Sequence, residues 1–317
     1  MSIVPERSDR LALRQLFKTR FGIQVRPRKE FIDDLKAALE RNTPYAVGRL
    51  GISEKHWMHY PALLEEQPSS AKRKAFEMRL LYHGMSQVGI FPAQTRFYLR
   101  YNQFFVDKLR DMDWLGLVLE PVLDPRVIHY YHLASKLIYH LDMIPDKSIP
   151  NNPDNCYVQY FAGKKILIVC PFGEFLKERA TQETFEGVWS KTGKKWFYPS
   201  CVDALEFPYG FDIETHKMYS TAFDLFEHIR AEIATRDFDI ALIAAAGLSV
   251  PIASVVKGMG KIAIDLGGEL QFLFGVIGKR WRDEGRWVKG YFTDWWIDVP
   301  AKYRPKQKGV AGAGAFW

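Results

Sequence analysis

The sequence predicts an α/β fold: a doubly wound, mainly parallel, Rossmann-like sheet with helical additions at its N-terminal end. The first observation is a pair of short apolar runs, Ala241–Ala246 and Ile262–Leu266, each of which ends at glycine and leads into a helical pattern. The second is a further run of this kind, Lys165–Cys170, which ends at a Pro171 turn before another helical pattern. Repeated strand–turn–helix units are typical of parallel sheets in α/β proteins.

Length and composition favour one folded domain. The chain has 317 residues, of which 47% are hydrophobic and 26% are charged, as in folded globular proteins. We therefore expect a single α/β domain over residues 1–317, with a helical lead-in over residues 1–44. The Pro/Asn-rich segment Ile149–Asn155 is the strongest loop signal and the best candidate for an internal boundary.

The N-terminal elements follow from apolar spacing. Residues 1–28 read as a basic lead-in of helix and loop, and Lys29–Arg41 repeats its apolar residues at helical spacing. A short strand is expected at Tyr45–Leu50, where apolar residues run together before a turn at Gly51. Ser53 has the side chain of an N-cap and is expected to start the next helix.

The middle of the chain alternates longer helical patterns with short apolar runs. These predict helices at Ser69–Gln87, Gln94–Leu109 and Tyr130–Leu141, and strands at Gly89–Pro92 and Trp114–Leu119.

The C-terminal half is more regular. After the strand at Lys165–Cys170, the same patterns predict helices at Glu174–Lys191, Ala222–Arg236, Ser249–Gly258 and Leu270–Ile277, and strands at Trp196–Tyr198, Ile240–Ala246 and Ile262–Leu266. The tail from Lys302 is basic, then rich in glycine and alanine, and it ends in Phe316–Trp317.

The charge balance favours anionic partners. The formal net charge is +7, and no block of six or more Lys and Arg marks a nucleic-acid-binding arm, so nucleic acid is not an expected partner. The cysteines, Cys156, Cys170 and Cys201, lack the CxxC spacing of zinc sites and are odd in number. No apolar run reaches the roughly 18 residues of a membrane span. We expect a cytoplasmic protein, with peripheral contact at the inner membrane face left open.

The segment Gly48–Glu54 joins a strand to a helix and carries candidate chemistry. Arg49 presents a planar fork suited to phosphate or carboxylate, and Gly51 permits a close backbone approach. Glu54 falls in the first helical turn, where it suits a catalytic base or a metal ligand. The alternative is an ordinary helix start in which Arg49 is the ion-pair partner of Glu54.

A second candidate is the Gly247 turn. The turn follows a buried strand and precedes a helix, so backbone amides there could bind phosphate. It has neither the GxGxxG pattern nor the lysine of a Walker loop, so no motif supports nicotinamide or ATPase chemistry. A tight strand-to-helix connection is the equally weighted alternative.

The third candidate follows the strand that ends near Asp265. A carboxylate there needs a partner or a role, because burying an unpaired charge is costly. Gly267, Gly268 and Gln271 would lie beside it, near the phosphates or the sugar of a ligand. The alternative is an ion pair with a nearby base, namely Lys279 or Arg280, which otherwise suggest that the ligand is an anion.

With these residues in view, the chain resembles the GT-D-type glycosyltransferases and their uncharacterised relatives in bacterial polysaccharide loci. The resemblance covers most of the chain and includes the closing Phe316–Trp317. Its marks are GRLGISE at 48–54, GIFP at 89–92, KILIVCPF at 165–172, FDIALIAAAG at 238–247 and IDLGGELQFLFGVIGKRW at 264–281.

The resemblance implies a nucleotide-sugar donor and a saccharide or lipid-linked acceptor in polysaccharide biosynthesis. Glu54 matches the glutamate of the family's motif, and we expect Glu54 or Asp265 to serve as the catalytic base or as a metal ligand. In the GT-D enzymes an Asp-x-Glu pair is tied to a metal–diphosphate site; here Ile52 replaces that aspartate. Either Glu54 holds Mn²⁺ or Mg²⁺ with other ligands, or Arg49, Lys279 and Arg280 neutralise the leaving diphosphate. A non-catalytic nucleotide- or sugar-binding assembly protein of the same fold is the alternative function.

Overall fold

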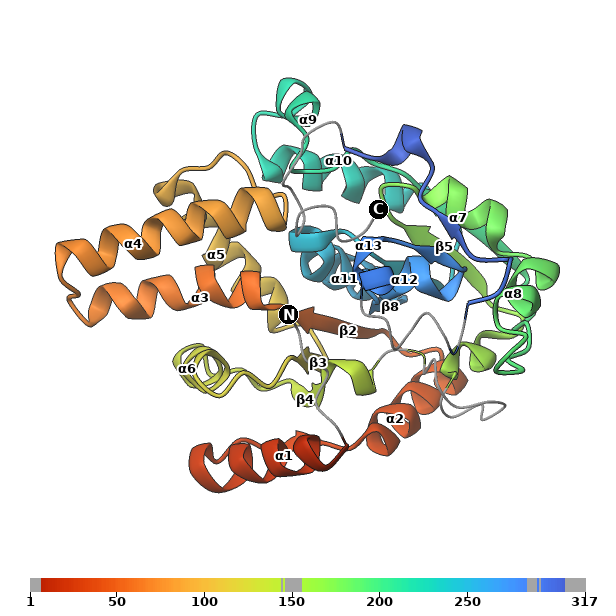
Figure 1. Ribbon diagram of the computed structural model, residues 1–317, viewed down its shortest axis with the longest axis horizontal. Coiled ribbons are helices and arrows are strands. Elements are labelled where there is room, and N and C mark those ends of the chain that lie inside the picture. Colours follow the sequence, from red (N-terminus) through yellow and green to blue (C-terminus); the bar gives the residue numbers. More distant parts are fainter. Residues whose placement is uncertain (1–6, 144, 146–155, 284–289, 291, 306–317) are drawn as a thin grey trace.

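The chain folds around an eight-stranded sheet in which all neighbouring strands are parallel (Figure 1). The computed structural model describes residues 7–143, 145, 156–283, 290 and 292–305. The spatial order is β1-β4-β3-β2-β8-β7-β5-β6. The strands are β1 (Val25–Arg26), β2 (Tyr45–Leu50), β3 (Trp114–Leu117), β4 (Lys136–Tyr139), β5 (Lys165–Val169), β6 (Cys201–Leu205), β7 (Ile240–Ile243) and β8 (Ile262–Asp265).

Helices cover both faces of the sheet, because successive side chains of each strand point to opposite sides. One apolar cluster joins one face to α1 (Arg7–Phe21), α3 (Ile52–Glu65), α5 (Thr95–Leu109), α6 (Leu123–Tyr130), α10 (Ala222–Ala234) and α11 (Ser249–Gly258). A second cluster joins the other face to α2 (Arg28–Arg41), α7 (Gly173–Arg179), α8 (Gln182–Val188), α12 (Glu269–Leu273) and α13 (Lys279–Asp283). The predicted doubly wound, parallel α/β fold is confirmed.

Helices α3 and α4 (Ser70–Leu81) form a hairpin that projects from the body of the molecule (Figure 1). A π-helical turn, η1 (Tyr82–Gln87), returns the chain to the sheet. Outside the main sheet lie α9 (Ile213–Met218), a small parallel pair of β9 (Val276–Ile277) and β10 (Ile297–Asp298), and the 3₁₀ turns His140–Asp142, Tyr157–Phe161, Ala246–Leu248 and Ala301–Tyr303.

Three of the predicted elements, at Tyr130–Leu141, Trp196–Tyr198 and Gly89–Pro92, have the wrong type. The segment Tyr130–Leu141 is not a helix, because its short apolar run forms β4 between β3 and β1. Such a run cannot be distinguished from a buried helix by periodicity alone. Trp196–Tyr198 forms no strand; its apolar signal comes from Trp196 and Phe197, which are buried and pack their rings on Phe185. The strand is β6, which pairs with β5 alone and leaves its first residues partly exposed, so its apolar signal is weak.

Several predicted boundaries also change. The helix expected at Glu174–Lys191 divides into α7 and α8, because Thr181 accepts a hydrogen bond from Thr184 N–H and caps a new helix. The helix expected at Leu270–Ile277 stops early, and Gly275 at φ +71° turns the chain into β9.

The segment Gly89–Pro92 is a loop rather than a strand, and the lead-in contains β1. Gly51, not Ser53, is the N-cap residue of α3. The boundary expected near Ile149–Asn155 and the closing Phe316–Trp317 lie outside the described residues.

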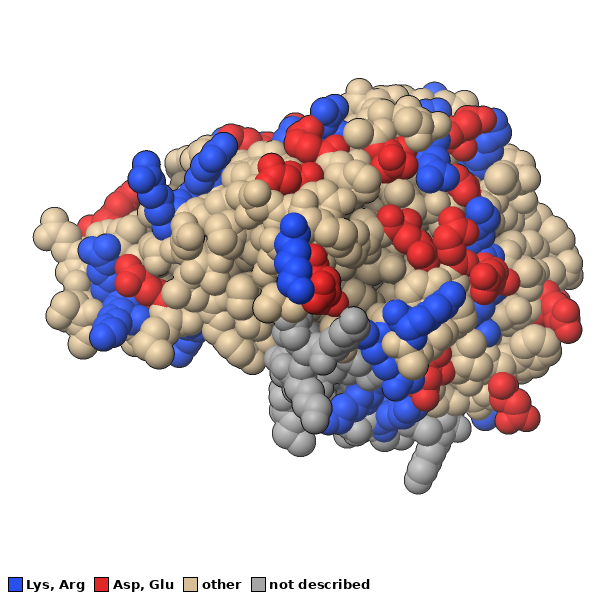
Figure 2. Space-filling model, turned by 90° about the horizontal axis from the view of Figure 1, so that it is seen from above, with Lys and Arg blue, Asp and Glu red and all other residues tan. Residues whose placement is uncertain are grey.

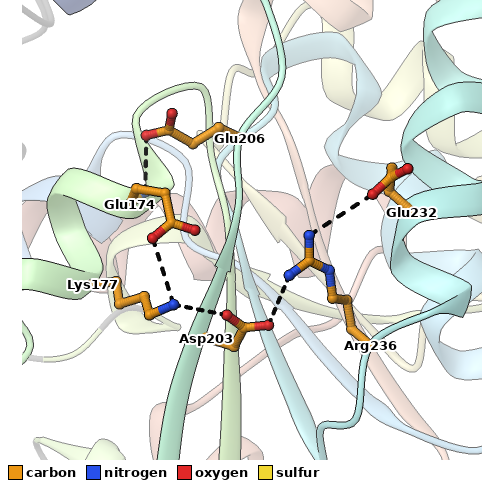
Figure 3. A network of polar contacts seen from close by, with 6 residues as sticks. All are labelled: Glu174, Lys177, Asp203, Glu206, Glu232 and Arg236. Carbon is orange, nitrogen blue, oxygen red and sulfur yellow. Dashed lines mark hydrogen bonds and ion pairs between the residues drawn. The ribbon is translucent and has the colours of Figure 1, made fainter.

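The edge of the sheet at β6 is held to its helices by charged side chains (Figure 3). Lys177 on α7 lies 2.9 Å from Asp203 on β6, and Arg236 after α10 lies 3.1 Å from the same carboxylate. Glu206 accepts a hydrogen bond from the backbone N–H of Glu174 at 2.9 Å. These contacts fix the loop after β6, which forms one wall of the candidate site.

Strand order also creates a crevice at the carboxyl edge of the sheet. β2 and β8 are neighbours, but the chain leaves β2 through α3 on one face and leaves β8 through α12 on the other. Parallel α/β sheets bind ligands where connections diverge in this way.

Candidate functional site

A pocket opens at this crevice, lined by residues in or directly after β2, β3, β4, β5, β6, β7 and β8. Its volume is about 230 Å³. This is somewhat less than the roughly 300 Å³ at which ligand-binding clefts usually begin. A ligand of nucleotide-sugar size would therefore fill the pocket with one part and extend over its rim with the rest.

Arg49, near the end of β2, connects the two strands at the crevice. Its Nη1 donates a hydrogen bond to the carbonyl oxygen of Leu266 at 2.6 Å, and its Nη2 lies 3.3 Å from His140 Nδ1. Since a guanidinium only donates, Nδ1 must accept, which places the proton of the neutral imidazole on Nε2. The buried Nε of Arg49 has no hydrogen-bond partner within the described part of the chain.

Gly267 makes room for this arginine. It has φ +50°, and a Cβ atom there would lie 2.5 Å from Arg49 Nη1. Both the backbone conformation and the close approach require glycine.

Asp265 is the last residue of β8 and is buried beneath the pocket. Its carboxylate accepts hydrogen bonds from the backbone N–H of Arg49 at 3.2 Å and of Gly267 at 3.0 Å. Burial raises the pKa of Asp265 to about 6, although the charge of Arg49 and these hydrogen bonds act in the opposite direction. Among the described side chains it forms no ion pair with Lys279, the partner weighed from the sequence.

Glu54 lies in the first turn of α3 and folds back over the N-cap residue, so that a Cβ atom on Gly51 would overlap its carboxylate. The residue keeps some exposed surface toward the pocket, while protein atoms surround the carboxyl group. This desolvation raises the pKa of Glu54 to about 7; a hydrogen bond from its own backbone N–H lowers it, and the charge of Asp265 raises it further.

The structure therefore brings most of the predicted site residues together around one pocket. They are Arg49, Gly51, Glu54, Asp265, Gly267, Gly268 and Gln271. The sequence predicts a close backbone approach at Gly51 and a ligand phosphate or sugar near Gly267 and Gly268. At Gly51 and Gly267 the group in close contact is a charged side chain of this protein itself.

The structure does not place the remaining predicted residues in the lining. Gly247 packs against the loop before α5: its N–H donates to Val88 at 3.1 Å, and a Cβ atom would lie 2.8 Å from Ile90. This geometry is that of the tight connection weighed as the alternative. Lys279 is exposed at the start of α13 and does not line the pocket. The side chain of Arg280 lies outside the described residues.

An aromatic wall, formed by Phe172, Phe207, Tyr209 and Phe211, faces the charged side of the pocket and was missed from the sequence. The rings of Tyr209 and Phe211 are stacked, with centroids 4.9 Å apart. Recognising β6 would have revealed Phe207, Tyr209 and Phe211, because their loop then follows the carboxyl end of a parallel strand, as Phe172 follows β5. His140 was missed for the same kind of reason, since it follows β4.

The loop that carries Tyr209 and Phe211 contacts the loop around Gly89 through two glycines, Gly210 and Gly89. A Cβ atom on Gly210 would overlap the carbonyl oxygen of Gly89, and Gly89 itself has φ +70°. The two backbones therefore touch directly beside the pocket, which only glycine permits at this spacing.

The side chains around the pocket do not fit a resident Mn²⁺ or Mg²⁺ ion. Glu54 and Asp265 are the carboxylates of the described lining, and both oxygens of Asp265 already accept backbone hydrogen bonds. Ile52, in the place of the expected aspartate, is 45% exposed and offers no oxygen. Across the described residues no group of three or more His, Cys, Asp or Glu side chains is placed to hold a metal. Hard divalent cations require several oxygen ligands.

Comparisons with known proteins show distant likeness in fold. No family model and no curated protein matches the chain. One similar solved structure is described as "The highly conserved domain of unknown function 1792 has a distinct glycosyltransferase fold"; it is 15% identical, covers 93% of this chain and 96% of its own, and has a TM-score of 0.47. Another, a selenomethionine-substituted structure of domain of unknown function 1792, is 16% identical, with coverages of 91% and 95% and a TM-score of 0.46. This likeness is too distant to transfer residue roles or a function.

Among the described residues, no helix combines the length and apolar character needed to cross a membrane.

Proposed function

We propose that this protein is a glycosyltransferase that moves a sugar from a nucleotide-sugar donor to a saccharide or lipid-linked acceptor. The observation that carries the proposal is the convergence of the resembling motifs. All five internal segments, which span residues 48–281, contribute to the lining of the same pocket. Four of these segments meet there because the carboxyl ends of parallel strands share one edge of the sheet, and the fifth, at 89–92, is the loop after η1.

Arg49 is the residue proposed to hold the donor diphosphate. Its guanidinium is already oriented by Leu266 and His140, so little side-chain entropy is lost when a phosphate binds nearby. The N-terminus of α3 adds positive potential at the same place. Fixed positive charge at this position would stabilise the negative charge that develops as the bond from the sugar to the diphosphate breaks.

Glu54 is the proposed base. As the acceptor hydroxyl oxygen bonds to the anomeric carbon, its proton passes to the Glu54 carboxylate, while the nucleoside diphosphate departs toward Arg49. A base works best when its pKa lies near the working pH, and burial brings Glu54 close to that value. Asp265 acts by positioning, because it binds the backbone of Arg49 and of Gly267.

The test is a panel of nucleotide sugars, with release of the nucleoside diphosphate as the readout. We expect turnover with at least one donor, and retained turnover in EDTA because the donor set does not fit a resident cation. Glu54→Gln should lower kcat by 10²- to 10⁴-fold, the usual contribution of a general base. The matched control, Glu183→Gln, changes an exposed glutamate on α8 and should leave kcat unchanged. Absence of turnover with every donor, with and without added manganese, would refute the proposal.

One observation favours a non-catalytic binding protein as the second candidate. Ile52 is exposed at the start of α3, where the resembling enzymes place a carboxylate. This candidate predicts that nucleotide sugars bind, measurably by calorimetry, without turnover. It also predicts that Glu54→Gln leaves the cellular function intact, which the transferase proposal excludes.

A further inference from the structure

The outer face of α4 carries an apolar stripe between cations. Helical periodicity places Ala71, Ala75, Met78 and Tyr82 along one line, on the side of the hairpin that faces away from α3. Met78 is 65% exposed and Tyr82 is 54% exposed, and because they lie four positions apart on this line they form one exposed apolar patch. The stripe is therefore a candidate contact surface.

Cations flank the stripe on both sides. Lys74 lies along one side, and Lys72 and Arg79 along the other, by the same helical spacing. Within the described part of the chain Lys74 and Arg79 form no ion pair, and the nearest carboxylate to Lys72 is Glu66 at 3.9 Å. Figure 2 shows Lys and Arg side chains over this projecting arm, with Asp and Glu side chains among them.

Contacts between the inner face of α4 and α3 determine which side of α4 faces outward. Phe76 stacks on Tyr60 of α3, with ring centroids 5.7 Å apart, and Leu80 is fully buried. Glu77, the one acidic residue of α4, accepts hydrogen bonds from Tyr60 and from Arg73. The carboxylate is thus turned inward, and the outward face carries positive charge without a negative neighbour on the same helix.

We propose that this outer face of α4, with Lys72, Lys74, Met78, Arg79 and Tyr82, docks on an anionic lipid surface. A helix with an apolar stripe bordered by Lys and Arg lies in the membrane interface, where the stripe enters the headgroup region and the cations meet lipid phosphates. Charge complementarity identifies the occupant, because the cytoplasmic leaflet carries negative surface potential. A nucleic-acid groove would match the cations but not the apolar stripe.

The docked face and the pocket belong to one continuous segment. Glu54 lies at the inner end of α3, and η1 leads from α4 to Gln87 and Gly89 in the pocket lining. Docking would therefore hold the pocket beside the bilayer. The consequence that a lipid-linked acceptor reaches the pocket rests on the proposed function; the docking itself does not.

Vesicle flotation of the full chain tests the docking without any donor or acceptor. The probes are vesicles of phosphatidylcholine alone and vesicles that also contain phosphatidylglycerol, at low salt. Each Lys or Arg near an anionic surface contributes about a five-fold factor in partition. Lys74→Glu with Arg79→Glu should thus lower binding at least about 25-fold, and Met78→Ser with Tyr82→Ser should lower it without a change in charge.

Matched controls on other helices separate the surface from overall charge. Lys217→Glu with Arg230→Glu, on α9 and α10, lowers the formal net charge of +7 by the same amount as the Lys74 and Arg79 pair. Met218→Ser changes a methionine that is 62% exposed. Both controls should keep vesicle binding.

The outcomes are decisive in each direction. Binding to phosphatidylglycerol vesicles that the α4 variants lose and the controls keep supports the proposal. Absence of binding by the native chain, or equal losses in the α4 variants and the controls, overturns it. Neither result bears on nucleotide-sugar turnover in solution, so failure of the docking and failure of the proposed transferase are distinguishable.

Discussion

Glu54→Gln should stabilise the folded protein at alkaline pH. Folding raises the pKa of this carboxyl from 4.5 to about 7. The folded state then binds the proton more tightly than the unfolded state, so the stability contributed by Glu54 is present below pH 4.5 and is lost as the pH rises to about 7. Glutamine does not titrate, so the Glu54→Gln variant does not lose this stability as the pH rises.

The size of the effect follows from the two pKa values. Once Glu54 is ionised in both states, folding is less favourable by about 3.4 kcal/mol, since each tenfold difference in proton affinity corresponds to about 1.36 kcal/mol. Between about pH 5 and about pH 8.5 the native chain should lose about 2.5 kcal/mol that Glu54→Gln keeps. Because the Glu54 residue keeps some exposed surface, solvent screening lowers the loss, and about 2.5 kcal/mol is its upper value.

Urea unfolding followed by circular dichroism at the two pH values measures the difference directly. Glu183→Gln serves as the control, because this exposed glutamate should change the pH dependence of unfolding by less than about 0.5 kcal/mol. Parallel pH profiles for the native chain and Glu54→Gln would refute the reasoning, since they would mean that Glu54 has the same proton affinity in both states.

Three further predictions concern the supports of the site. Gly267→Ala should lower the free energy of unfolding by about 1–3 kcal/mol, because Gly267 has φ +50° and contacts Arg49; Gly260→Ala, also at positive φ but with open space around it, should cost less in the same urea titration. Asp124→Asn should lower the free energy of unfolding by about 3–5 kcal/mol, because it removes the partner of Lys55 from a fully buried ion pair. Adding Lys55→Met should restore most of that stability, and equal stability of the single and double variants would contradict this prediction. If the proposed function holds, Arg49→Lys should lower kcat/KM at least about tenfold, because an ammonium cannot reproduce both guanidinium contacts; an unchanged kcat/KM would remove Arg49 from the donor site.

Apolar runs that end at a glycine or proline turn identified the central strands and the helices that follow them. Helix α11 and strand β2 were predicted with their observed bounds, and β5, β7 and β8 were predicted within one to three residues. These strands are buried on both sides and read as continuous apolar runs, which is the pattern of parallel sheets. β6 lies at the edge with its first residues partly exposed, so its run was not recognised.

Local sequence therefore determined the fold class, the central strands and the residue types able to carry chemistry at their ends. It also identified Arg49 and Asp265 as candidate site residues, each from its own segment. Only the tertiary structure decided that they touch, although 216 positions separate them, because the pairing of β2 with β8 is a long-range event that no local pattern encodes. The order of the other strands brought His140, after β4, and the aromatic wall, after β5 and β6, to the same pocket, whereas Gly247 and Lys279 lie outside its lining. Which residues share a site depends on strand order, and strand order depends on how two apolar faces are covered by helices from both halves of the chain.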